Sequence, residues 1–419
     1  MVSRRRESPP GAPSRAERRE RARALPAADA PPPRAASRAL PLPLGPPGGY
    51  TSSMRIAVSC RSLEYPSGGV REYLVSLLDA LLELDRRNTY VLFHSDARFL
   101  GRFPGAEEVS LGCSNRLVFD WFRLPPALKR HGIDLAFFPS SNMPPGVPCK
   151  AVAAMMDLGY FHGEYRMYRL ADTLYMRVAM ARTARRAERL LAISGHTRRE
   201  LEDILGVPGH KVSVTHLAAD PLYHRPVPPE AVAELKSRLG LTRPFFLYTG
   251  NISPRKNLKG LLEAFADVKD RADADLVVTG GSGWSQDFER WVAALGLEGR
   301  VRRLGHVERA DMPALYAAAL AFVFPSLYEG FGLPVLEAQA VGTPVVCSTA
   351  ASLPEVAGQS ALMADPADRR AMAQALADVA ADPALRARLS EAGRANAARF
   401  SWRETARQTL EVFEEALRA

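Results

Sequence analysis

The chain has 419 residues, of which 47% are apolar and 24% charged, and its formal net charge at pH 7 is +9. This composition is typical of a soluble globular protein, and the length predicts about two domains that each bury a core. We expect no membrane-spanning helix and no signal peptide, because no apolar run is long enough for either. The four cysteines lie far apart without metal or redox spacing, which favours a reduced cytoplasmic setting.

Residues 1–53 differ from the rest of the chain. They hold 11 of the 33 prolines, ten arginines, four acidic residues and no lysine. Such a segment buries too little apolar surface to offset the entropy of ordering, so we expect it to be disordered. It carries +6 of the total +9, so the basic balance is weak support for a nucleic-acid partner, and we expect none. Two interpretations stand: translation begins at Met54, or a basic arm touches anionic lipid.

From Met54 onwards short apolar runs alternate with helical patterns, which predicts parallel sheets covered by helices. In the first half we expect strands at 55–60, 89–94, 134–138, 151–156, 189–193 and 211–215, and helices at 69–84, 121–131, 168–187 and 196–205. The proline-rich stretch Pro221 to Pro229 is the predicted linker. In the second half we expect strands near 245–249, 275–279, 300–304, 321–324, 344–347 and 361–363, each followed by a helix. Residues 367–419 read as almost wholly helical, with breaks at Pro383 and Ser401.

A strand, a turn and a helix in the second half carry adjacent basic residues. Phe245 to Gly250 reads as a buried strand, and a helix is predicted from Leu258 to Val268. Arg255 and Lys256 lie on the turn, where a guanidinium fork and an ammonium group suit a diphosphate. A solvated basic loop is the alternative. Asn257 is the predicted N-cap of the helix.

A second strand, turn and helix carries two carboxylates eight positions apart. Glu329 falls on the turn at the carboxyl end of a strand, where open α/β sheets bind ligands. We expect the helix to begin at Pro334, which lacks the N–H that a helix start leaves unpaired, and Glu337 to lie on its first turn. The helix N-terminus presents backbone N–H groups to an anion. The groups expected to do so belong to Phe331, Gly332 and Leu333. Carboxylates beside such amides suit a ligand with both hydroxyls and phosphates.

These two units resemble a known family. Residues Thr249–Asn257 are similar to the Gly-x-x-x-Pro-Arg-Lys-Asn element of retaining glycosyltransferases of family 4, and Glu329–Glu337 matches their E-x7-E signature. Residues Ala350–Gly358 resemble the next block, and the likeness spans residues 54–415. It implies the GT-B fold, an α/β architecture of two Rossmann-like domains with parallel sheets facing across a cleft. It also implies a GDP- or UDP-linked sugar as donor substrate, and no cofactor.

The resemblance also divides the chain. We expect the tail at 1–53, an N-terminal Rossmann-like acceptor domain at 54–222 and a linker with a lead-in helix at 223–240. A C-terminal Rossmann-like nucleotide-sugar domain is expected at 241–399, followed by a C-terminal helix at 400–419. In the family this last helix crosses back to the first domain.

Roles follow residue by residue from the matched motifs. Glu329 would hydrogen-bond the sugar hydroxyls and Glu337 the ribose, while Arg255 and Lys256 would stabilise the leaving diphosphate. Further donor-side candidates, on turns that follow strands, are Gly250, Gly281 and His306. Candidates for the loops near the acceptor or the reactive end of the donor are Gly68, Gly69, Asp157 and His162. His162 is otherwise a plain surface histidine, and the two glycines a plain tight turn.

One position departs from the family pattern. Members of this type usually show His-Asp-Leu where this chain has Met156, Asp157 and Leu158. The identity of any acceptor-side histidine is therefore open. None of the eight histidines pairs in a metal motif, which predicts metal-independent chemistry.

The expected reaction is retaining transfer of a hexose, with mannose favoured by analogy, to a glycan or lipid-linked acceptor in polysaccharide or lipopolysaccharide synthesis. The expected location is cytoplasmic. A helical stretch with several arginines is compatible with peripheral contact at the inner membrane face, while a solvated helix face is the favoured interpretation. Those arginines are Arg166, Arg169, Arg177, Arg182, Arg185 and Arg186. Two other functions stay open: a nucleotide-sugar hydrolase or epimerase on the same fold, and a silent subunit that only binds nucleotide-sugar.

Overall fold

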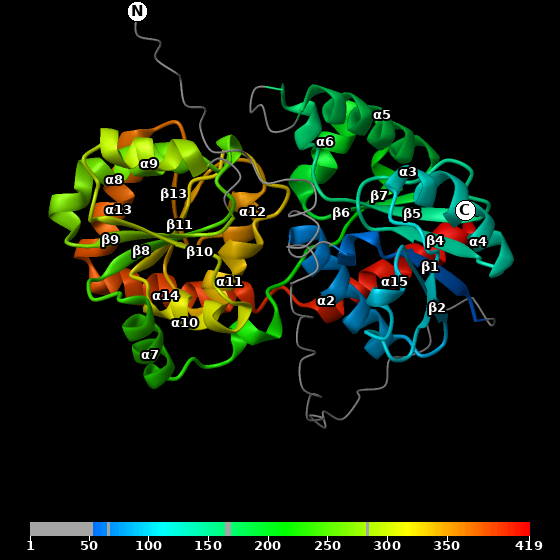
Figure 1. The fold of residues 1–419 in the computed structure, drawn as a ribbon, viewed down its shortest axis with the longest axis horizontal. Helices are drawn as coiled ribbons and strands as arrows, with labels where there is room; N and C mark the ends of the chain where they lie inside the picture. The colour runs from blue at the N-terminus through cyan, green and yellow to red at the C-terminus, as the bar shows by residue number, and fades with distance from the viewer. Residues whose placement is uncertain (1–52, 65–67, 164–168, 282–284) are drawn as a thin grey trace, which may run out of the picture. The chain divides into compact units, whose positions relative to one another are not determined.

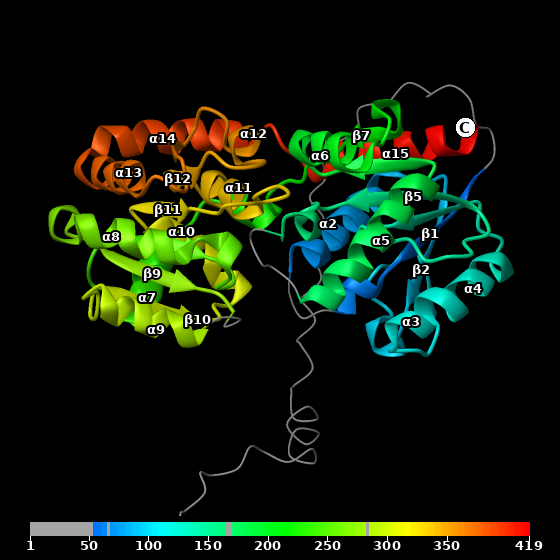
Figure 2. The same cartoon turned by 90° about the horizontal axis from the view of Figure 1, so that it is seen from above.

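The computed structural model describes residues 53–64, 68–163, 169–281 and 285–419 (Figures 1 and 2). Residues Ser52–Ala419 form one compact unit. The expectations for the N-terminal tail and for Arg166 lie outside the described residues.

The first parallel sheet has seven strands within the described residues, in the order β3-β2-β1-β4-β5-β6-β7. Their bounds are β1 (Arg55–Ser59), β2 (Thr89–His94), β3 (Glu107–Ser110), β4 (Leu135–Phe138), β5 (Lys150–Met155), β6 (Arg189–Ala192) and β7 (Val212–Val214). Six of them match predicted strands. The sequence analysis missed β3, because this short edge strand reads Glu-Glu-Val-Ser and has no apolar run.

Alternation along β1 distributes its side chains between two helical layers. Ile56 and Val58 belong to the core cluster that includes residues of α2 (Gly69–Leu84) and α15 (Trp402–Arg418). Ala57 points to the opposite face, where the core includes residues of α4 (Leu124–Arg130), α5 (Leu170–Arg186) and α6 (Gly195–Leu205). Ser194 caps α6, since its Oγ accepts a hydrogen bond from Thr197 N at 3.0 Å.

The helix predicted at 121–131 is longer and less regular than expected. It begins as α3 (Arg116–Val118), continues as the π-helical turn η3 (Phe119–Arg123) and ends as α4. Its start was missed because the capping residue, Asn115, precedes a stretch whose apolar side chains are exposed. Asn115 Oδ1 accepts a hydrogen bond from Val118 N at 3.2 Å.

The second parallel sheet has six strands among the described residues, in the order β10-β9-β8-β11-β12-β13. Their bounds are β8 (Phe245–Thr249), β9 (Asp275–Thr279), β10 (Val301–Gly305), β11 (Ala321–Phe324), β12 (Val345–Ser348) and β13 (Leu362–Ala364). All six match predicted strands within one residue. The helices of this half are α7 (Pro229–Leu239), α8 (Leu258–Ala272), α9 (Ser285–Ala294), α10 (Met312–Ala318), α11 (Leu333–Val341), α12 (Leu353–Ala357), α13 (Arg369–Ala381) and α14 (Pro383–Ala397).

In each sheet the strand order reverses at one point. The chain moves outward from β1 to β2 and β3, and then returns to the other side of β1 with β4. It does the same around β8, with β11 on the far side. Ligands of open α/β sheets bind outside the carboxyl ends of the strands at such a switch point. The fold thus confirms the expected pair of Rossmann-like sheets and offers two places for a ligand.

The C-terminal helices follow the predicted breaks. Pro383 begins α14, and Ser401 Oγ caps α15 by accepting from Glu404 N at 3.1 Å. The red helix α15 lies against the blue helix α2 in Figure 1. Its Phe413 ring is 5.3 Å, centroid to centroid, from the Phe137 ring of β4. The boundaries proposed for the two domains stay a prediction. No described helix is long and apolar enough to cross a membrane.

We expect Phe413→Ala to lower the free energy of unfolding by about 3–5 kcal/mol, because it leaves a cavity between α15 and the first sheet. Chemical denaturation is the measurement, with Arg403→Ala on the exposed side of the same helix as control. An equal, small effect of both substitutions would show that α15 does not hold the first sheet.

Candidate active site

A buried carboxylate and two cations meet at the switch point between β8 and β11. Arg255 and Lys256 lie on the short turn η8 (Pro254–Lys256) after β8, and Glu329 lies on the loop after β11. Glu329 Oε2 is 2.9 Å from Arg255 Nη1, and its Oε1 is 2.5 Å from Lys256 Nζ. Arg255 Nη1 also donates to the Tyr328 carbonyl at 3.0 Å, so the guanidinium joins the two loops.

The electrostatics of this group differ from those of free side chains. Glu329 is only 7% exposed. Burial alone would raise its pKa, but the charges of Lys256 and Arg255 outweigh burial and lower the pKa to about 2. Burial also lowers the pKa of Lys256, although Glu329 opposes this shift. With the carboxylate charged and both cations protonated, the group has one positive charge in excess, which suits an added anion.

The helix start beside Glu329 differs by one residue from the prediction. α11 begins at Leu333, so Pro334 is its second residue and Glu337 lies on its second turn. Ser352 Oγ is within 2.8 Å of the Glu329 carbonyl and 2.7 Å of the Phe331 carbonyl, and it fixes the loop. No described residue accepts a hydrogen bond from the amides expected to meet an anion. These amides belong to Phe331, Gly332 and Leu333.

The basic turn also differs in one detail. Asn257 precedes α8, but its backbone is left-handed, with φ 52°, and its side chain does not cap the helix. Instead Asn257 Nδ2 donates to the Pro366 carbonyl at 2.9 Å. The predicted side-chain cap is therefore wrong, because the left-handed backbone turns the amide towards the loop after β13.

The ends of β8 and β9 approach each other backbone to backbone. Gly280 has φ +130°, and a Cβ there would lie 2.2 Å from the Gly250 carbonyl oxygen, so only glycine fits. Gly250 N donates to the Thr279 carbonyl at 3.0 Å, and Ile252 N to that of Gly281 at 3.4 Å. Gly250 and Gly281 thus shape the loops at this edge of the sheet.

Glu337 lines a cavity of about 330 Å³. The walls also include two donor-side candidates, Leu333 and His306, and Arg71 from α2. Tyr316 Oη donates to Glu337 Oε2 at 3.1 Å. Burial raises the pKa of Glu337 to about 7, and the hydrogen bond from Tyr316 only partly opposes it. The two carboxylates of the motif therefore lie in opposite environments.

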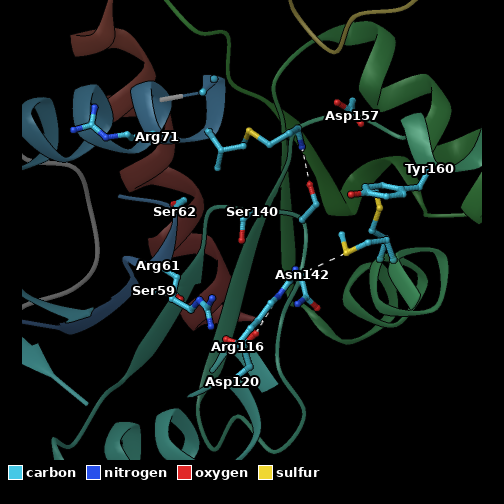
Figure 3. A pocket seen from close by; sticks show the side chains of 17 residues that line it. Ser59, Arg61, Ser62, Arg71, Arg116, Asp120, Ser140, Asn142, Asp157 and Tyr160 are labelled. Atoms are coloured by element: carbon cyan, nitrogen blue, oxygen red, sulfur yellow. Dashed lines mark hydrogen bonds and ion pairs between the residues drawn. The ribbon is translucent and has the colours of Figure 1, made fainter. Parts of the chain in front are cut away.

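A second cavity, of about 370 Å³, lies at the β1/β4 switch point of the first sheet (Figure 3). Its walls include Ser59, Arg61, Ser62, Gly68, Gly69, Arg71, Arg116, Asp120, Ser140, Asn142, Met156, Asp157 and Tyr160. Arg61, Arg116 and Asp120 lie at one end in Figure 3, and Asp157 and Tyr160 at the other. A Cβ on Gly68 or Gly69 would meet nothing within 4 Å, so these glycines face open space.

Unpartnered polar atoms point to the chemistry of this second cavity. Arg61 Nη1, Ser62 Oγ and Arg71 Nε are buried and have no hydrogen-bond partner among the described residues. All three residues line the cavity, and Arg71 lines the Glu337 cavity as well. Buried donors without partners are costly unless a ligand or water meets them. The sequence analysis named neither Arg61 nor Ser62, because nothing local marks them.

The loop with Asp157 lies against the loop with Glu329. A Cβ on Gly330 would be 2.0 Å from the Met156 carbonyl oxygen and 2.9 Å from Asp157 Cβ. Leu158 N donates to Tyr328 Oη at 2.9 Å. Burial raises the pKa of Asp157, while the amide of Gly159 opposes that shift. The structure thus brings Asp157 close to the Glu329 group, although it comes from the other sheet.

His162 does not line the second cavity. Its Nε2 is 2.5 Å from Glu200 Oε1, and its ring is 4.7 Å from the Tyr328 ring. Tyr328 Oη in turn donates to Glu200 Oε2 at 2.6 Å. Burial would raise the pKa of Glu200, but contacts with His196 and Tyr328 lower it. Tyr328 directly precedes Glu329, so this network connects α6 to the site, and no sequence pattern indicated it.

Glu355 forms a second connection that sequence reasoning left without a role. It lies on α12, and its carboxylate accepts from Gly195 N at 2.8 Å and from His196 N at 3.2 Å. Both amides belong to the N-terminus of α6, where a negative charge is favourable. His216 Nε2 is 2.6 Å from Glu355 Oε1. The block Ala350–Gly358 was the available signal for this residue.

No group of three or more metal-ligating side chains occurs among the described residues. The diphosphate-binding chemistry expected of the site rests on Arg255, Lys256 and the start of α11.

Comparisons with known proteins agree on the family. Residues 67–221 match the family model Glycosyltransferase Family 4, and residues 233–396 match Glycosyl transferases group 1. The chain is 31% identical to O-antigen chain mannosyltransferase B of Escherichia coli over 382 residues, which cover 86% of this chain and 99% of the relative.

Two solved structures share the fold. Anabaena HepE in complex with UDP-glucose has a TM-score of 0.70 and 20% identity, and the match covers 86% of this chain and 100% of HepE. Sucrose-phosphate synthase from Thermosynechococcus elongatus has a TM-score of 0.71 and 21% identity, with 86% of this chain and 98% of that chain covered.

The raised pKa of Glu337 predicts a pH-dependent effect of Glu337→Gln on stability. In the unfolded chain this carboxyl ionises near its ordinary value of 4.5, but in the ligand-free fold only near 7. The wild type therefore loses stability as pH rises from about 4.5 to about 7, and the glutamine variant does not. We expect equal stability at pH 4 and a gain of about 3 kcal/mol for the variant at pH 8.

Denaturation of the ligand-free protein at both pH values measures this effect, with Glu391→Gln, at an exposed position, as control. A gain that is the same at pH 4 and pH 8 would contradict the assignment.

Proposed function

The chain belongs to the group 1 glycosyltransferases of family 4, GT-B enzymes that transfer a sugar from a nucleotide-sugar donor, and on that premise we propose a retaining hexosyltransferase. The proposed sugar is mannose, carried by GDP or UDP, because the relative matched over 99% of its length is named a mannosyltransferase. The proposed acceptor is a glycan, either free or linked to a lipid.

The observation that carries the proposal is the contact of Glu329 with Arg255 and Lys256 at the β8/β11 switch point. Negative charge builds on the diphosphate as it leaves the sugar. Two cations and the start of α11 are in place to stabilise that charge without moving. Arg255 and Lys256 bring two positive charges to the single negative charge of Glu329, and this balance suits a phosphate oxygen.

We assign different tasks to the two glutamates. Glu329 accepts hydrogen bonds from sugar hydroxyls, and its low pKa keeps it charged at any working pH. Glu337, in the cavity that Arg71 also lines, accepts from the ribose hydroxyls. The acceptor hydroxyl attacks on the face from which the diphosphate departs, and no protein side chain forms a covalent intermediate.

The first-sheet cavity is the proposed acceptor subsite. Arg71 lines both cavities, so an acceptor held there lies next to the donor. The unpartnered Arg61 Nη1 and Ser62 Oγ offer donors to acceptor oxygens. The proposed location is the cytoplasm, with peripheral contact to the inner membrane face when the acceptor is lipid-linked.

We expect Arg255→Ala and Lys256→Ala each to weaken binding of a free nucleoside diphosphate by about 1.5–3 kcal/mol, the range for a hydrogen bond to a charged group. Calorimetry with GDP and with UDP measures it and identifies the base. Lys259→Ala is the matched control, since its ammonium is exposed on the next helix and 3.7 Å from Glu263. Unchanged affinity in both site variants would remove these residues from the donor site.

The two glutamates are expected to separate in kinetics. Glu329→Gln should lower kcat far more than nucleotide affinity, because contacts that strengthen in the transition state appear in kcat. Glu337→Ala should weaken the binding of both the free nucleoside diphosphate and the sugar donor. Steady-state transfer and calorimetry on the same samples provide the data, and added chelator should leave transfer unchanged.

Other outcomes identify the rival functions. Release of free sugar or an epimer without any acceptor would identify a hydrolase or epimerase. A wild-type protein that binds donor but never turns it over, across a broad acceptor panel, would be a silent subunit.

A further inference from the structure

Exposed apolar side chains gather on two segments of the first half. Nine large apolar side chains are exposed among the described residues, and seven of them lie in 116–123 or on α5. These seven are Leu117, Val118, Trp121, Phe122, Leu170, Leu174 and Val178. Leu170 is 85% exposed and Phe122 68%. Such clustering on a soluble protein marks an interaction surface, whereas single exposed side chains do not.

The two segments are neighbours. Arg116 of α3 lies over the Tyr175 ring of α5, 5.6 Å from its centroid, and its Nη2 is 3.9 Å from Met176 Sδ. Figures 1 and 2 both place α3 beside α5. We call these seven side chains together the α3–α5 surface.

Helix α5 is apolar on two sides. Leu170, Leu174 and Val178 repeat every four residues and form one exposed stripe. Met176 and Met180 are buried in the core of the first sheet. A surface helix of a soluble protein normally presents polar residues where this stripe lies. The stripe therefore needs a partner that accepts apolar side chains.

The charges around the α3–α5 surface point to the partner. Two arginines of the basic helical stretch turn inwards: Arg177 Nε donates to the Tyr160 carbonyl and Arg182 Nη2 to that of Met143, both at 2.7 Å. The exposed charged side chains in 116–130 and 169–186 are basic except for Asp172. The exposed basic residues are Arg123, Lys129, Arg130, Arg169, Arg185 and Arg186. An excess of exposed cations on the same two segments as the exposed apolar side chains complements anionic lipid.

We propose that the α3–α5 surface docks this enzyme on a bilayer that contains anionic lipid. The apolar side chains enter the interface, where Trp121 suits the headgroup level, and the exposed basic side chains bind the headgroups. The proposal rests on the proposed function for its purpose. Arg116, Asp120 and Met176 line the first-sheet cavity and come from the same two segments, so a lipid-linked acceptor in the bilayer reaches that cavity directly.

The test is sedimentation of the full chain with vesicles. One set holds phosphatidylcholine alone, and the other adds phosphatidylglycerol. The double variant Phe122→Ser, Leu174→Ser removes one apolar side chain from each segment. Leu100→Ser, Ile204→Ser is the matched control, because Leu100 and Ile204 are the exposed large apolar side chains of the described residues outside the surface.

We expect the wild type and the control to bind anionic vesicles, and the first double variant to bind at least about tenfold more weakly. Each substitution removes the favourable free energy of moving an apolar side chain from water into the bilayer. Arg185→Gln with Arg186→Gln should reduce the preference for phosphatidylglycerol. Melting temperatures should stay unchanged, because every substituted side chain is exposed.

Three results would overturn the proposal. The first is a wild type that does not bind vesicles, and the second is an equal loss of vesicle affinity in both double variants. The third is a wild type that forms a dimer and binds no vesicles, while the first double variant is a monomer. The last result would assign the surface to a second copy of the chain. Nucleoside-diphosphate affinity, measured on the same samples, keeps the two hypotheses apart: vesicle binding without nucleotide affinity would contradict the proposed function alone.

Discussion

The pairing of Glu329 with Arg255 and Lys256 is the interaction on which the β8/β11 switch point of this protein depends. It joins the loops after β8 and β11, the two strands between which the sheet order reverses. A buried carboxylate is costly unless cations compensate it, and breaking such a pair leaves an uncompensated charge. The loops therefore hold one another in place. Two further segments fix the Glu329 loop, because Ser352 Oγ donates to the Glu329 carbonyl and Leu158 N donates to Tyr328 Oη.

The same geometry occurs twice in the molecule. Each sheet has one switch point, and each switch point carries a polar group: the Glu329 group at β8/β11, and the cavity with Arg61 and Ser62 at β1/β4. Between them the Asp157 and Glu329 loops are in backbone contact at Gly330, where no side chain fits. A donor and an acceptor held at the two switch points would thus meet at loops that touch.

Environment, more than residue type, sets the roles of the two motif carboxylates. Glu329 and Glu337 are eight positions apart, yet one has a pKa lowered to about 2 and the other a pKa raised to about 7. Two cations contact the first. Burial raises the pKa of the second, and the carboxylates of Glu72 and Asp220 oppose the lowering effect of Arg309. The environment of Glu329 stabilises its charged form, whereas the ligand-free fold destabilises the charged form of Glu337. A ribose that donates hydrogen bonds would relieve that penalty.

The sequence by itself determined the strands other than β3, most helices and the residues that meet at the β8/β11 switch point. Apolar runs, Pro383, Ser401 and the clusters around Arg255 and Glu329 are local signals, so they were readable without coordinates. Tertiary structure decided what depends on residues distant in the chain. The pairing of Tyr328 with Glu200 and of Glu355 with the start of α6 has no local pattern, because the partners lie on different elements. The burial of Arg61 Nη1 without a hydrogen-bond partner among the described residues is set in the same way by the packing around it. The sequence also did not predict that Arg177 and Arg182 point inwards while an apolar stripe of α5 is exposed. The sequence of a helix does not determine which of its faces packs against the sheet.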